Sequence, residues 1–230
     1  MKPKMPTPPR KVQALAQQAT RDVSSAALKY KNMPRDEIRK RLIAAWPLKV
    51  YVLGTLALLE RNNLKAATPV AWRFLILHNK RPVASTEIAF RTKDRGPRWT
   101  RTSYNLRHLR VMETAKRLES HRELRRGNYE LRFLRIPGLD LNGLLWLHSL
   151  DGNEDRVVQV GRSRMLRAGW LYDAAGLLAR LRPHAERRRR PLSLAVQSNP
   201  ANPDQRSQND ALVQLQAANN AKPVSGGGRA

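Results

Sequence analysis

Cationic and aromatic side chains gather in one short stretch, residues 91–101, which reads RTKDRGPRWTR. Gly96 and Pro97 favour a turn, so the stretch is predicted to be an exposed loop. Guanidinium groups hold phosphates and an aromatic ring stacks on a nucleobase, a composition typical of nucleic-acid contacts. In the alternative, Trp99 folds back to anchor the loop and the cations are simply solvated. The candidate contacts are Arg91, Lys93, Arg95, Arg98, Trp99 and Arg101.

A second row of polar side chains has the spacing of one helix edge. Arg107, Arg110, Thr114, Arg117 and His121 follow one another at steps of three and four residues, which places them along one side of a helix. Such an edge could follow a phosphate backbone, and its three arginines are candidate nucleic-acid contacts. The alternative is an ordinary solvated face that borders the core.

A third basic feature is the run of four arginines at 187–190, namely Arg187, Arg188, Arg189 and Arg190. The run could hold a polyanion without reading its sequence, or it could be a solvated linker. The whole chain of 230 residues has 44 Lys and Arg against 18 Asp and Glu, a formal charge of +26. A surplus of this size favours a polyanionic partner, with DNA or RNA ahead of anionic lipid.

Signatures of an enzyme are absent from the sequence. It contains no GxxxxGK[ST], GxGxxG or HExxH motif and no cysteine, so common phosphate loops, thiolate nucleophiles and Cys-type metal sites are not predicted. His148, Ser149 and Asp151 could form a catalytic or metal group, but adjacent strand residues face opposite sides. Asp155 and its acidic neighbours are better explained as turn residues than as cation ligands. No catalytic residue, metal or cofactor is therefore assigned, and an enzyme is disfavoured.

The clearest fold signal is residues 129–161, where YELRFLRIPGL, LLWLHS and DRVVQV are three apolar runs separated by turn residues. They predict three strands, with a bulge near Phe133 because the apolar alternation changes phase there. The residues Asp151 to Asp155 are suited to a hairpin turn. The segment resembles part of small bacterial proteins of unknown function, a resemblance that implies no activity.

The remaining elements follow from apolar periodicity and from turn residues. Helices are predicted over 11–30, 35–46 and 48–61, although Val50-Tyr51-Val52 leaves a strand open for part of the third. A hairpin is predicted over 72–90, a helix over 103–126 with Ser103 as its cap, and a last helix from Ser163 to a stop before Pro183. The proline-rich residues 1–10 are predicted to be a flexible basic arm.

Together these elements predict an α+β fold: N-terminal helices, a mostly antiparallel sheet of about five strands with one helix inserted, and a C-terminal helix. We expect a single basic domain over 11–190 and a disordered tail over 191–230, which is rich in Asn, Gln, Ser and Gly. Val50–Leu59, the longest apolar run, is too short to span a bilayer, and a cytoplasmic bacterial protein is expected. The predicted function is phosphate binding to nucleic acid with little sequence specificity. The alternative is an assembly adaptor that docks a protein partner, and the oligomeric state stays open.

Overall fold

The computed structural model describes residues 3–31, 42–61, 63–90, 96–104, 107–124, 127–152 and 154–197, and gives only the backbone for 22–31, 107–109 and 189–197. The chain divides into two compact units, Met1–Glu186 and Arg187–Ala230, which are described separately. Predictions for the tail beyond Gln197 and for residues 91–95 lie outside the described residues. None of the helices described is long and apolar enough to cross a bilayer.

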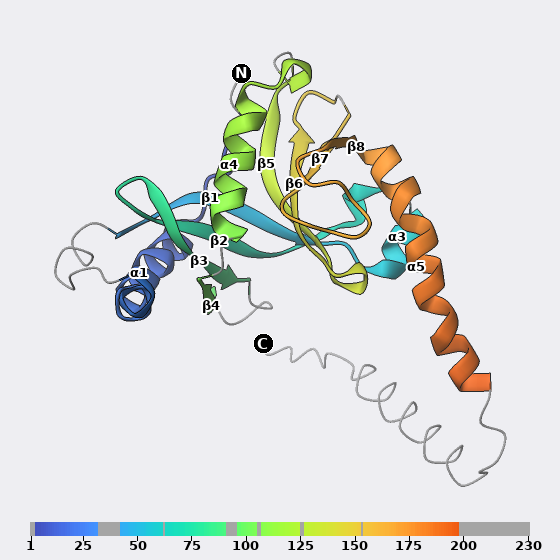
Figure 1. The fold of residues 1–230 in the computed structure, drawn as a ribbon, viewed down its shortest axis with the longest axis horizontal. Helices are drawn as coiled ribbons and strands as arrows, with labels where there is room; N and C mark the ends of the chain where they lie inside the picture. The colour runs from blue at the N-terminus through green and yellow to red at the C-terminus, as the bar shows by residue number, and fades with distance from the viewer. Residues whose placement is uncertain are drawn as a thin grey trace, which may run out of the picture. The chain divides into compact units, whose positions relative to one another are not determined.

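Eight strands form one sheet in the first unit, in the order β4-β3-β2-β1-β5-β6-β7-β8 (Figure 1). The first four strands along the chain make one antiparallel meander and the last four make another. The two meanders meet where β1 pairs with β5 in parallel. The strands are β1 (Leu42–Val52), β2 (Thr68–His78), β3 (Arg81–Ala89), β4 (Arg98–Ser103), β5 (Tyr129–Ile136), β6 (Leu141–Ser149), β7 (Arg156–Gln159) and β8 (Leu171–Asp173).

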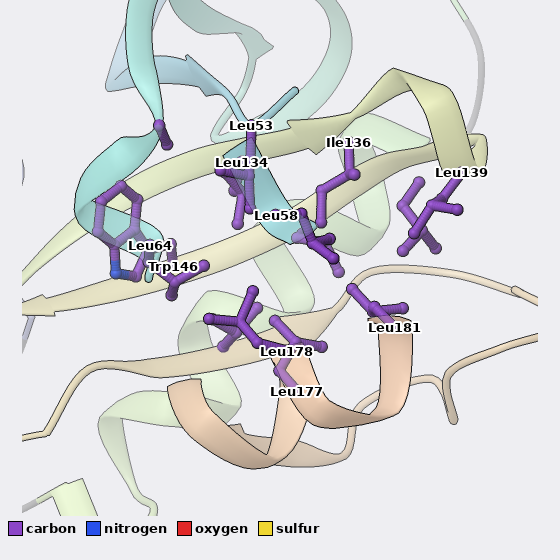
Figure 2. Close-up of a cluster of buried hydrophobic side chains, with 14 of the residues drawn as sticks. Leu53, Leu58, Leu64, Leu134, Ile136, Leu139, Trp146, Leu177, Leu178 and Leu181 are labelled. Atoms are coloured by element: carbon purple, nitrogen blue, oxygen red, sulfur yellow. The ribbon is translucent and has the colours of Figure 1, made fainter. Parts of the chain in front are cut away.

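Helices cover both faces of this sheet. On one face, α4 (Arg107–Glu119) buries Val111, Ala115 and Leu118 against strand residues such as Phe133. On the other face, α3 (Thr55–Arg61) and the start of α5 (Ala174–Gln197) pack on β5 and β6. Figure 2 shows the leucines of this second cluster between the strands and α5, with Trp146 at one end of the cluster. The helix α1 (Arg10–Lys31) also packs on the face that α3 and α5 cover. Its residues Val12 and Ala16 contact Trp72 and Phe74 of β2.

The prediction of an α+β fold is confirmed, but the estimate of about five strands is wrong. The hairpin over 72–90 is confirmed as β2 and β3, with Asn79 and Lys80 at positive φ in its turn as a two-residue hairpin requires. The three strands of 129–161 are confirmed as β5, β6 and β7. The extra strands are β1, β4 and β8, which come from segments predicted to be helix or loop.

The strand β1 replaces part of two predicted helices. Its register slips between Ala45 and Leu48, where Trp46 has φ 55° and Pro47 follows. Proline is tolerated in strands at such irregularities, so Pro47 bends the strand and does not end a helix. The helical pattern of 48–61 is realised only from Thr55, as α3, because both sides of β1 are paired with other strands and the sheet outweighs local propensity.

The strand β5 has no bulge near Phe133. Tyr129, Leu131 and Phe133 face the α4 side, whereas Leu134 and Ile136 face the α3 and α5 side. The apolar alternation in the sequence changes phase at Phe133 and Leu134 because both faces of the strand are buried there, and two consecutive residues are then apolar. A register shift against β6 occurs later, between Leu134 and Ile136.

Both ends of the predicted domain also differ from expectation. Lys4, in the predicted flexible arm, makes two backbone hydrogen bonds to β5, with Tyr129 at 2.7 Å and Leu131 at 2.9 Å. The last helix begins at Ala174, not at Ser163, and runs through Pro183 to Gln197. Residues 163–170 therefore form a loop. Gly169 has φ 72°, a backbone conformation that is incompatible with a regular helix at this position.

The α4 side of the sheet also buries a cluster of charges centred on Glu87 of β3. Its carboxylate accepts from Arg101 of β4 at 3.2 Å and from Arg135 of β5, and it lies 3.7 Å from Nε of Arg73 on β2. Glu87 and Arg73 are each only 7% exposed at the side chain. Burial alone would raise the pKa of Glu87, but the neighbouring Arg135, Arg73 and Arg101 together hold the pKa below the ordinary value of 4.5.

Replacing Glu87 by Gln is expected to reduce the free energy of unfolding by about 3–5 kcal/mol at pH 7, because buried guanidinium groups lose their counterion. The pKa of Glu87 is lower in the folded state, so its contribution is complete above pH 4.5 and is lost as the pH falls through the folded value. The difference in the free energy of unfolding between wild type and Glu87→Gln should therefore become smaller below pH 4.5. Urea unfolding at pH 7 and at acidic pH measures this, with Glu60→Gln on the exposed side of α3 as the control. An equal loss in both variants would contradict the role of the cluster.

Candidate nucleic-acid interface

A hollow of about 290 Å³ lies between α4 and the loop that joins β7 to β8. Arg110, Glu113 and Arg117 line it from the helix, one turn apart, as expected for steps of three and four residues. Gln159 at the end of β7, and Arg162 and Gly169 in the loop, line the opposite side. The predicted helix edge is thus one wall of a concave basic surface, which we call the α4–loop hollow.

The loop over 160–170 is fixed by hydrogen bonds and by the buried side chain of Leu166. Gly169 N–H donates to the carbonyl of Gln159 at 2.9 Å, which closes the loop at its base. Val160 N–H donates to the carbonyl of Gly143 at 2.7 Å and attaches the loop to β6. Arg167 N–H donates to the hydroxyl of Tyr172 at 2.9 Å. The loop can therefore hold its shape without burying its own arginine side chains.

Gly161 allows the helix and the loop to approach closely. Its φ is 90°, which favours glycine. A Cβ atom built there would lie 3.4 Å from Nη1 of Arg110. The guanidinium of Arg110 thus lies directly against the loop backbone, which positions it at the wall of the hollow.

Arg110, Arg117 and Arg162 are exposed, and the structure shows none of them in an ion pair with a described carboxylate. Glu113 lines the same hollow, which leaves a surplus of two positive charges when three arginines are set against one acid. Charges in a concave surface reinforce one another's field. The arrangement can therefore attract and hold a phosphate.

The loop also carries an exposed tryptophan, directly after a residue that lines the hollow. Trp170 follows Gly169 and is 52% exposed. The guanidinium carbon of Arg167 lies 5.0 Å from its ring centre, within the range of a cation–π contact. Sequence analysis missed this group, although GRSRMLRAGW at 161–170 has the same mixture of arginine, glycine and tryptophan as residues 91–101. The helix predicted from Ser163 concealed it.

The structure brings together only part of the predicted site. Arg110 and Arg117 line the hollow, whereas Arg107 begins α4 with its side chain undescribed, and Arg91, Lys93 and Arg95 lie outside the described residues. Arg98 is exposed on β4. Arg187 to Arg190 belong to α5 in the second unit; Arg187 and Arg188 are exposed there, and the side chains of Arg189 and Arg190 are undescribed.

Trp99 and Arg101 do not form one patch. Nε1 of Trp99 donates to Thr86 at 3.0 Å, whereas Nε of Arg101 donates to Glu87 at 3.2 Å. Thr86 and Glu87 are neighbours on β3 and so face opposite sides of the sheet. A register shift between β3 and β4 at this point accounts for the division. Trp99, 41% exposed, thus makes a hydrogen bond to the sheet, as the anchoring alternative predicts.

The His148, Ser149 and Asp151 group is not assembled as a triad. Nδ1 of His148 lies 3.1 Å from Asp155, and the Ser149 hydroxyl donates to Asp151 at 2.8 Å. Asp155 also accepts from Nε1 of Trp146 at 3.0 Å and from Ser149 N–H at 2.8 Å. Asp155 therefore fixes the turn between β6 and β7, as expected of a turn aspartate. No set of three metal-ligand residues converges within the described part of the chain.

Comparison of the chain with protein-family models, with curated proteins and with solved structures gave no significant match.

The turn role of Asp155 predicts a loss of stability on Asp155→Ala. The substitution leaves the buried indole N–H of Trp146 and the Ser149 amide without their acceptor, at about 1–3 kcal/mol for each unsatisfied group. Guanidinium unfolding followed by tryptophan fluorescence would measure the loss. Glu154→Ala is the control because Glu154 is exposed and pairs with Arg156 at the surface. Similar small effects in both variants would show that the bonds of Asp155 are dispensable.

Proposed function

We propose that this chain is a basic nucleic-acid-associated protein that holds phosphates through the α4–loop hollow, with little sequence specificity. The observation that carries the proposal is the set of three arginines, Arg110, Arg117 and Arg162, that meet at one concave surface without an ion pair to a described carboxylate. Phosphate oxygens are natural partners for such groups because a guanidinium can donate two parallel hydrogen bonds.

The proposal agrees with the charge of the whole chain. At +26, like charges repel one another throughout the molecule, and a polyanion relieves that repulsion while releasing its own counterions. The other basic segments, Arg98 with residues 91–95 and the run at 187–190, would add contacts to phosphates outside the hollow. Backbone contacts of this kind position a nucleic acid but carry no sequence information. We further propose a cytoplasmic location, where DNA and RNA are both accessible.

Removing the three arginines of the hollow should lower both affinity and its dependence on salt. For Arg110→Gln/Arg117→Gln/Arg162→Gln, we expect the slope of log affinity against log salt to fall by about two to three, since each phosphate contact contributes about 0.7–0.9. Fluorescence anisotropy with labelled DNA and RNA over a salt series measures the slope. The protein must first be freed of bound nucleic acid by nuclease and a high-salt wash.

The matched control is Arg61→Gln/Lys80→Gln/Arg81→Gln, which removes the same charge from exposed positions of α3 and of the β2–β3 turn. If the control lowers the slope as much as the hollow variant, the binding follows net charge and not the hollow. If the unmodified protein shows no salt-dependent binding near physiological ionic strength, the proposal fails. The assembly adaptor would then be the function to test, by co-purification of protein partners.

A further inference from the structure

We infer that the preferred partner is single-stranded nucleic acid, with one unpaired nucleotide in the α4–loop hollow and an adjacent base stacked on Trp170. The inference rests on the proposed function and adds the strandedness of the partner. It depends on two features of the same loop: the mixed chemistry of the hollow and the open aromatic ring beside it.

The hollow is not built for phosphate alone. Glu113 stands among the three arginines, and a carboxylate there repels a bare phosphate but accepts hydrogen bonds from N–H groups. A nucleotide carries both a phosphate and, on most bases, N–H donors at the edge. At about 290 Å³, the hollow is at the lower end of small-ligand pockets. That volume is of the order of one nucleotide.

Trp170, the residue after Gly169 of the hollow, offers a flat apolar surface. The residue is 52% exposed, and the guanidinium carbon of Arg167 lies 5.0 Å from its ring centre, so part of the side chain is open to a second planar group. Stacking of a base on an aromatic ring is the usual way in which proteins bind single strands without reading their sequence. Because Trp170 directly follows Gly169 of the hollow, adjacent nucleotides of one strand can reach both places.

A duplex can neither stack a base on Trp170 nor place an unpaired base in the hollow. Its base faces are covered by their neighbours in the stack, so a duplex presents phosphates and groove edges to the protein. It would contact the arginines at the rim of the hollow but would leave Trp170 exposed to water. The structure thus predicts a contribution to binding that single strands have and duplexes lack.

Trp99 is a natural control for Trp170. It is 41% exposed, but its indole N–H is bonded to Thr86, and it lies on β4 and not at the hollow. The experiment compares Trp170→Ala with Trp99→Ala in the full-length protein. The probes are a labelled single-stranded oligonucleotide of mixed sequence, as RNA and as DNA, and the duplex of the same sequence.

For Trp170→Ala we expect affinity for the single strand to fall about tenfold or more, as for the loss of one stacked base, with an unchanged salt slope because no charge is removed. Affinity for the duplex should stay the same, and Trp99→Ala should bind both probes as the unmodified protein does. Trp170→Phe should recover part of the affinity because a smaller ring still stacks. Far-UV circular dichroism and urea unfolding confirm that each variant is folded.

The outcomes separate this inference from the proposed function. Equal affinity of the unmodified protein for single strand and duplex, or an equal effect of Trp170→Ala on both, would overturn the single-strand inference and leave phosphate binding intact. Absence of salt-dependent binding to any probe would overturn both. If Trp99→Ala lowers the affinity for the single strand as much as Trp170→Ala does, stacking is not specific to Trp170 and its assignment is overturned.

Discussion

The ion pairs of Glu87 stabilise the joint on which the rest of the fold depends. The two meanders meet through the short parallel pairing of Lys49–Val52 with Arg132–Arg135, and parallel pairing is slightly less stable per residue than antiparallel pairing. Arg135 extends from that joint to Glu87 in the other meander. One carboxylate therefore couples β5 to β3 on the face that α4 covers. The helix that carries Arg110 and Arg117 is positioned by a sheet that this cluster holds together.

The structure uses arginine in two different ways, and the difference identifies the site. Arg73, Arg135 and Arg132 each lie near a carboxylate, and each also contacts the face of an aromatic ring. These contacts pair the charge and pack the apolar stem of the side chain. Arg110 lies against Gly161 of the loop and Arg162 belongs to that loop, and neither has an ion pair with a described carboxylate. The first group stabilises the fold, and the second is available to a ligand.

The sequence predicted strands well where the chain alternates or runs apolar between clear turns, as in β2, β3 and β5 to β7. It failed over most of β1, where a strand was left open only at Val50–Val52, because pairing on both sides of that strand outweighs the helical spacing of its leucines and alanines. Half of the hollow could be predicted, since the edge of α4 follows from steps of three and four residues. The other half could not, because the positive φ of Gly161 and the backbone bonds of Gly169 to Gln159 and of Val160 to Gly143 place Arg162 opposite α4. The periodicity of a sequence does not predict hydrogen bonds of this kind.

The uncompensated charge of the hollow is itself an argument for a ligand. Exposed arginines near one another repel, and those of the hollow take no part in the buried clusters that stabilise the sheet. Their contribution to folding is therefore slight or unfavourable in the absence of an anion. The surrounding backbone is fixed in advance by the bonds of Gly169 and Val160, so a bound phosphate would not have to order the loop. Preorganised cations with little role in folding are the arrangement that binding requires.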